Sequence, residues 1–426
     1  MAGIWEKPGF ARFWTADNVS GFGTQITAVA LPTLAIVTVH ATDTQVGLLS
    51  GARWTPYLLF GLLAGVIADR YRRRPLLVAT DLARVGLLAL IAALALAGGL
   101  TIVGLTVFVV VFGTLTLLYE AAHQSYLPRL VTGPDLTTAN ARIAQSASVA
   151  QASGPFLGGA LVAAIGAPVA LLVDAVSYLV SGLLLLTIRR AEPVPPRQQR
   201  SLRAELREGT AWVYRHRQLA PYAVTLHVRF VFGSINSVAF VLLVVRELGG
   251  SGPDAAFGYG VVLAVGGIGS VIGASLSSVA GRRGAGRVIL IERLTEPVGW
   301  ALAAVAVTGA AGWVMVGAAQ FVVWFVIGLG SPNEMAWRQS VTPDRLQGRM
   351  NATIRSLNWG MFTIGAPLGG LLSERLGYRP TIAIAAAGMA LAAIVAALSP
   401  LRSARIADAP LPPAQRSGDT ELVPDP

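Results

Sequence analysis

Long apolar stretches recur along the chain, and they constrain its fold more than any other feature. A helix needs about 20 mainly apolar residues to cross the hydrocarbon core of a bilayer, and the 426-residue chain has twelve stretches of this kind. Six lie in the first half, at 19–39, 46–68, 76–97, 102–119, 143–165 and 169–188. Six more follow, at 222–245, 257–279, 288–307, 313–330, 354–372 and 380–398. The sequence therefore predicts an all-α membrane protein with twelve transmembrane helices.

The charges lie mainly between these stretches and predict the orientation of the chain. Only 13% of the residues are charged, whereas a soluble protein has about a quarter. A net charge of +11 would suggest a nucleic-acid partner in a soluble chain. Here, a cytoplasmic N-terminus places 25 of the 33 basic residues in cytoplasmic loops and only Arg246, Arg375 and Arg379 in outer loops. Because basic loops stay in the cytoplasm, we expect a multi-pass protein of the inner (cytoplasmic) membrane with both termini inside and no nucleic-acid partner. The first residues show no cleavable signal peptide.

The two halves of the sequence repeat each other. Gly154 and Gly365 are 211 positions apart, and so are the pairs Gly158-Gly159 and Gly369-Gly370. This offset predicts two pseudo-symmetric six-helix bundles, at 1–190 and 218–400, as in transporters that bind substrate near the midplane between rocking halves. The arginine- and proline-rich segment 191–217 is expected to be a cytoplasmic linker with an amphipathic helix, and 401–426 a disordered cytoplasmic tail.

A motif at the end of the second stretch carries a family resemblance. Residues 65–74 read GVIADRYRRR, which resembles the loop signature G-x-L-A-D-R-x-G-R-K of the major facilitator superfamily, with Arg72 in place of its second glycine. The resemblance implies a conformational latch against the other half, formed by Gly65, Asp69, Arg70, Arg73 and Arg74. The alternative is an ordinary basic loop on the cytoplasmic side.

A second motif narrows the resemblance. Gly154, Pro155, Gly158 and Gly159 follow the pattern G-P-x-x-G-G, which resembles the end of the antiporter motif of drug exporters. Residues 341–352 resemble the matching loop in the branch that includes enterobactin and macrolide exporters. The alternative for the glycines is tight helix packing, because the eleventh stretch has a similar pattern.

Ionisable residues inside the predicted spans are functional candidates, because an unpaired charge there is costly. Asp17, Glu296 and Asp174 are the candidate proton-coupling carboxylates; the alternative is that each is paired with an arginine. Asp81 and Glu292 match at offset 211, which favours a structural role for both, with Arg84 as the ion-pair partner of Asp81.

Polar and aromatic side chains predict a substrate cavity. The candidates are Gln25, Arg53, His227, Arg229, Asn236, Gln320 and Trp324. In the resembled family, spans one, four, seven and ten line the cavity, which agrees with most of these positions. Trp54, Tyr57, Tyr178 and Trp359 could stack on a ligand ring or pack between helices.

The sequence favours a transporter over an enzyme. It contains no Walker loop, metal-ligand helix or catalytic triad, and no cysteine, so we expect no metal and no cofactor other than a proton gradient. The leading hypothesis is a monomeric, proton-coupled exporter of a drug, antibiotic or siderophore-like molecule that works by alternating access. The alternatives are a facilitator or importer of a small metabolite, and a receptor or scaffold that transports nothing.

Overall fold

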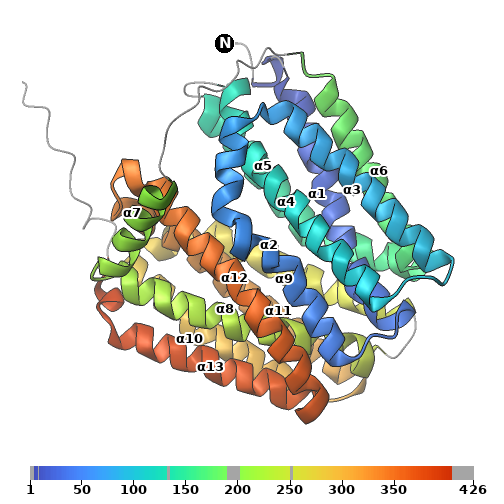
Figure 1. The fold of residues 1–426 in the computed structure, drawn as a ribbon. Coiled ribbons are helices and arrows are strands. Elements are labelled where there is room, and N and C mark those ends of the chain that lie inside the picture. Colours follow the sequence, from blue (N-terminus) through green and yellow to red (C-terminus); the bar gives the residue numbers. More distant parts are fainter. Residues whose placement is uncertain (1–3, 8, 132–134, 190–201, 250–252, 405–426) are drawn as a thin grey trace, which may run out of the picture.

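The computed structural model describes residues 4–7, 9–131, 135–189, 202–249 and 253–404, except the side chains of 62–70, 137, 202–206 and 253. The first half forms α1 (Phe10–Thr33), α2 (Asp43–Arg70), α3 (Arg73–Leu96), α4 (Ile102–Leu130), α5 (Asp135–Ile165) and α6 (Ala167–Leu186). The second half forms α8 (Leu219–Leu242), α9 (Pro253–Gly281), α10 (Ala285–Ala304), α11 (Gly309–Ser340), α12 (Asp344–Leu376) and α13 (Tyr378–Leu398). Between the halves, α7 (Leu202–Arg215) lies within the predicted linker segment (Figure 1).

Each predicted stretch overlaps one of these long helices over most of its length, which confirms the all-α membrane fold. Among the described residues, nine helices are long and apolar enough to cross a membrane. The helices α2, α10 and α12 are not among the nine. Part of α2 lies among the residues whose side chains are not described, α10 has Glu292, Arg293 and Glu296 within its apolar part, and α12 is less apolar than the others. The three charged residues of α10 are buried.

The repeat is visible in the packing of the helices. In the first half α1 packs against α5 and α6, and α3 packs against α4 and α6; in the second half α8 packs against α12 and α13, and α10 against α11 and α13. The turns before α6 and α13 use Gly166 (φ 81°) and Gly377 (φ 89°), a left-handed conformation that favours glycine. The helices α1 and α8 both continue into π-helical segments, Leu34–Thr38 and Leu243–Leu248.

The two ends of the bundle differ in what they contain. The 3-10 helix at Ile4–Glu6, α7 and the 3-10 helix at Pro400–Ser403 lie at one end, which we call the linker end; the opposite end is the far end. The packed structure extends past the expected start of the tail at 401. Leu401 and Ala404 are buried, and the carbonyl of Ala404 accepts a bond of 3.0 Å from Gly286 N–H. Residues 405–426 lie outside the described residues.

The two halves meet through α2 against α12 and α5 against α9, which are side by side in Figure 1. Glycines make both contacts close. A Cβ on Gly159 would lie 2.7 Å from the carbonyl oxygen of Ala256 and 3.0 Å from Gly260 Cα, and a Cβ on Gly370 would lie 3.0 Å from Gly47 Cα. The repeat-related glycines thus bring the halves together on the far-end side of the molecule.

Candidate substrate cavity and its charged network

A cavity of about 570 Å³ lies mainly within the second half. It extends along α11 from Gln320 to Arg338, and so reaches the linker end. Four of the predicted cavity residues line it: Arg229, Asn236, Gln320 and Trp324.

The other three predicted cavity residues lie elsewhere. Gln25 packs against Gly154 where α1 meets α5, and the guanidinium of Arg53 lies 5.6 Å from the Trp54 ring centroid. His227 sits behind the cavity wall, where its Nδ1 lies 2.7 Å from the Oδ1 of Asn358, a lining residue.

The cavity wall combines rings with unpaired acceptors. Trp300, Trp324, Trp359, Phe230 and Phe362 are among its aromatic residues. Asn236 and Gln320 are 1% and 2% exposed, and the side-chain carbonyl oxygen of each has no hydrogen-bond partner among the described residues. Because an unpaired buried acceptor is costly, a ligand with a hydrogen-bond donor and an apolar ring system would match this wall.

Buried charges form a network beside the cavity. The Nε of Arg229 donates to Glu296, and its Nη2 lies 3.5 Å from Glu292 Oε1. The Nη2 of Arg293 lies 2.7 Å from Glu334 Oε1, which also brings α10 and α11 together. Glu296 is therefore paired with an arginine, as the alternative reading of the sequence allowed.

The acids of the first half are paired differently. Asp174 is fully buried, and its two oxygens accept bonds from Thr27 (2.5 Å) and Ser177 (2.9 Å). No arginine or lysine lies within ion-pair distance of it among the described residues. Asp17 lies 2.9 Å from His123 Nε2 and is 21% exposed.

The predicted ion pair between Asp81 and Arg84 is present. Their closest oxygen and nitrogen atoms are 3.7 Å apart, and the second oxygen of Asp81 accepts a bond of 2.7 Å from Ser181. The guanidinium of Arg84 lies between the rings of Tyr119 and Tyr178, 4.3 and 4.7 Å from their centroids. This charge is thus held by rings as well as by the carboxylate.

Two contacts between the halves were not predicted. Trp54 of α2 and Trp359 of α12 stack with centroids 4.2 Å apart and ring planes at 9°. Nearby, Arg355 of α12 pairs with Glu120 of α4. The sequence singled out the two tryptophans as possible stacking residues but gave no sign that they stack on each other, because they are 305 positions apart.

The latch motif is only partly described. Gly65, Asp69 and Arg70 end α2, and their side chains lie outside the described residues. Arg73 is buried, and Arg74 donates to the carbonyls of Leu185 and Leu186 at the end of α6, in its own half. Arg72 has φ −64° and ψ 127°, an ordinary extended conformation, so no glycine is needed there. The latch across the halves stays a prediction.

The glycines of the antiporter-like motif pack against two helices. Gly154 and Gly158 face α1, where a Cβ would lie 2.5 Å from Gln25 Cβ and 3.0 Å from Ile26 Cα, whereas Gly159 faces α9. In α12, Gly365 and Gly369 face α8 in the same way, and Gly370 faces α2. Pro155 lies inside α5. Tight packing thus accounts for the glycines, and a role in antiport stays a prediction.

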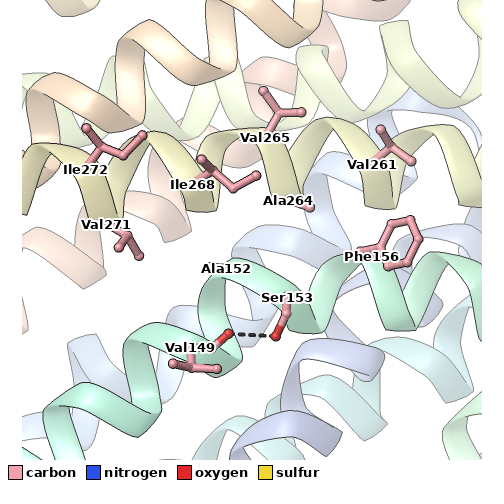
Figure 2. A pocket seen from close by; sticks show the side chains of 10 residues that line it. All are labelled: Val149, Ala152, Ser153, Phe156, Val261, Ala264, Val265, Ile268, Val271 and Ile272. Atoms are coloured by element: carbon pink, nitrogen blue, oxygen red, sulfur yellow. Dashed lines mark hydrogen bonds between the residues drawn. The ribbon is translucent and has the colours of Figure 1, made fainter.

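On the linker-end side of the glycine contact, α5 and α9 still touch, because a Cβ on Gly267 of α9 would lie 2.4 Å from Ala152 Cα of α5. A cleft of about 560 Å³ lies between them, lined by apolar residues and Ser153 (Figure 2). Val149 of α5 and Ile268 of α9 are 53% and 51% exposed, whereas Phe156 and Phe257 are in ring contact nearer the far end, at 5.8 Å. The contact between α5 and α9 therefore extends past the glycines, and the apolar cleft lies beside it.

Polar contacts hold the halves together at the far end. Arg246 of the second half donates to the carboxylate of Asp43 and to the carbonyl of Ala41 in the first half. The backbone N–H of Thr44 donates to Glu374 at 3.0 Å. Burial raises the pKa of Asp43 although Arg246 opposes this, and the bonds from Thr44 lower the pKa of Glu374. We call Ala41, Asp43, Thr44, Arg246 and Glu374 the far-end clasp.

The linker helix α7 binds the second half at the linker end. Glu208 of α7 pairs with Arg345 and Arg349 of α12, and Tyr214 lies 2.7 Å from His227 Nε2. Burial lowers the pKa of His216, whose Nδ1 accepts from the backbone N–H of Leu219 at the start of α8.

Comparison with known proteins identifies the family. The family model described as transmembrane secretion effector matches residues 5–417. The chain belongs to this family of the major facilitator superfamily. It is thus a membrane transporter of the superfamily and not an enzyme, and a small-molecule substrate follows from the family.

Relatives and solved structures agree with this placement. The chain is 24% identical over 397 residues to YfiS of Bacillus subtilis (strain 168), an uncharacterized MFS-type transporter, covering 87% of this chain and 90% of YfiS. The nucleoside transporter NupG has the same fold, with a TM-score of 0.75 at 12% identity and coverage of 92% and 98%. An inward-facing, unoccupied bacterial homologue of the lysosomal transporter Spinster gives a TM-score of 0.70 at 15% identity, with coverage of 95% and 98%.

Proposed function

We propose that this transporter exports an amphipathic small molecule, such as a drug, an antibiotic or a siderophore-like compound, in exchange for protons. The observation that carries the proposal is the cavity of about 570 Å³ whose wall combines aromatic rings with unpaired buried acceptors. A ring-containing ligand that also carries a donor group fits such a wall. The family description as a secretion effector and the loop resemblance to enterobactin and macrolide exporters support the outward direction.

Alternating access follows from the two ends of the molecule. The far-end clasp and the glycine contacts hold the halves together at the far end, while the cavity of about 570 Å³ reaches the linker end along α11. With the linker end in the cytoplasm, as the basic loops predict, this is the state that loads substrate from inside. Rocking of the halves would break the clasp and bring the latch residues together.

Proton coupling requires a carboxylate that can exchange a proton as the halves move. Asp17, Glu296 and Asp174 are the predicted carriers. Among these three, the contacts favour Asp174, because Asp17 lies against His123 and Glu296 accepts from Arg229. Hydroxyl donors alone hold Asp174 in a fully buried site, where an ionised carboxylate is poorly compensated.

Facilitated transport or import of a small metabolite is the second candidate. It is favoured by one observation, the likeness in fold to the nucleoside transporter NupG. A receptor or scaffold role is less favoured, because buried charges and a cavity are costly features that such a role does not require.

Transport in membrane vesicles tests the direction and the coupling. Everted vesicles that contain the protein are energised with an acidic interior, and the uptake of ethidium, a labelled macrolide, enterobactin and uridine is measured. Export predicts proton-driven accumulation of one of the first three compounds, with loss in Asp174→Asn. Uptake of uridine alone, in right-side-out vesicles and without a proton gradient, would support the second candidate and refute the first.

A further inference from the structure

The three buried acids of the second half are not equally paired. Glu296 accepts from Arg229, and Glu334 accepts from Arg293 at 2.7 Å and from the hydroxyl of Tyr222 at 3.0 Å. Glu292 is 1% exposed, and its closest cationic contact is the 3.5 Å approach of Arg229 Nη2. Its Oε2 has no hydrogen-bond partner among the described residues.

The arginines nearest to Glu292 donate to the other two acids. Arg229 faces it from α8, and Arg293 and Glu296 lie on its own helix. Glu334 faces it from α11 and also accepts from Tyr222 of α8. Arg338 lies farther along α11, where it contacts the sulfur of Met335 at 3.3 Å and has no ion pair among the described residues. The Arg338 guanidinium also lies 5.9 Å from the Tyr222 ring centroid, and its charge acts on Glu334. Among the described residues, Glu292 is therefore the one acid of the three to which no arginine donates a hydrogen bond.

The unpaired oxygen of Glu292, Oε2, is closely packed against α11. A Cβ on Gly330 of α11 would lie 1.8 Å from Glu292 Oε2, so this oxygen lies directly against the backbone of α11. No side chain can enter between them to neutralise the charge. A proton bound to the Glu292 carboxyl group neutralises the charge instead, and it removes the cost of an uncompensated ion at this depth.

We infer that Glu292 is the proton-binding carboxylate of the second half, in place of Glu296. It takes one proton from water and returns it, while Glu296 keeps its bond to Arg229. When the proton leaves, Glu292 attracts Arg229 more strongly, and Arg229 lines the cavity between the two acids. Proton release is thereby linked to the shape and charge of the cavity wall. The role in transport rests on the proposed proton coupling, whereas the proton site itself does not.

Infrared difference spectroscopy of the purified full-length protein in nanodiscs, titrated with pH, tests the site without any substrate. The spectra are recorded in an Asp174→Asn background, so that this candidate does not contribute. We expect the C=O stretch of a buried protonated carboxyl group, which disappears in Glu292→Gln and persists in the matched variant Glu296→Gln. If Glu292→Gln does not fold, Glu292→Asp is measured instead, and its shorter side chain should shift the frequency of the C=O band.

The outcomes separate this inference from the proposed function. An unchanged band in Glu292→Gln, an unchanged band in Glu292→Asp, or loss of the band only in Glu296→Gln overturns the assignment. If the band is lost in Glu292→Gln but transport does not depend on the proton gradient, the proton site is supported and the proton coupling is refuted. A band and gradient-driven transport that are lost together support both.

Discussion

Breaking the far-end clasp should shift the balance between the two transport states. In Arg246→Met the chain keeps a side chain of similar length, but Asp43 loses its charged donor. Hydrogen bonds to charged groups contribute about 1.5–3 kcal/mol, and the side chains of Arg246 and Asp43 are 29% and 10% exposed, which reduces the value. We therefore expect the far-end-closed state to lose about 2 kcal/mol, which changes its ratio to the open state about 30-fold.

Spin-label distances across the far end measure this shift. The chain has no cysteine, so Ala97→Cys at the end of α3 and Val307→Cys before α11 give one label on each half. Both positions are exposed. In Arg246→Met, the population at long distance should rise relative to the labelled parent. Adding Asp43→Asn should recover part of the loss, because the unpaired buried charge is then gone.

Arg379→Met is the matched control. Arg379 also bonds one carboxylate, that of Glu247, and one carbonyl, that of Ala306, and its side chain is 29% exposed, but all three residues belong to the second half. It should leave the distance distribution unchanged. Equal distributions in the two arginine variants would refute the assignment of the clasp as a contact that holds the halves together.

Three further results are expected. Gly159→Leu should prevent the far end from closing, because the new side chain meets the backbone of α9; the label distance should lengthen, whereas Gly86→Leu, which has open space around it, should not change it. The free energy of unfolding should fall as pH drops below about 6.5, because burial lowers the pKa of His216 and the unfolded chain then binds the proton more readily. His216→Asn keeps a hydrogen-bond acceptor, and in this variant the unfolding midpoint should depend less on pH. Trp359→Ala should weaken ethidium binding about tenfold in a fluorescence titration, since a ring in the cavity wall contributes about 1.4 kcal/mol; unchanged affinity would place the ligand elsewhere.

The repeat explains why much of the fold could be predicted. The offset of 211 between Gly154 and Gly365 implies that both lie at equivalent places, and both do face the first helix of their half. Glycines spaced along one face of a helix indicate where another helix packs closely, and this spacing can be read from a short piece of sequence. The order of the helices and their close packing at these glycines were therefore accessible from the sequence.

The pairing of charges was not accessible in the same way. Arg355 pairs with Glu120, which is 235 positions away, and Asp17 pairs with His123 rather than with an arginine. Such partners depend on the angle between helices and on side-chain reach, and a single sequence records neither. The same limit applies to the cavity, since Gln25, a predicted cavity residue, faces Gly154 instead.

Asp81 and Glu292 show that equivalent positions can hold different roles. Asp81 has Arg84 and Ser181 as partners, but an offset of 211 places Thr295 and Ala392 where Glu292 would need them. Asp81→Asn leaves Arg84, which is 3% exposed, without its counter-charge, so we expect a loss of about 3 kcal/mol in stability. Glu292→Gln replaces a protonated carboxyl group with a neutral side chain of similar shape, and it should leave the unfolding midpoint unchanged or raise it. An equal fall in both variants would mean that Glu292 is an ionised structural partner of Arg229 and not a proton site.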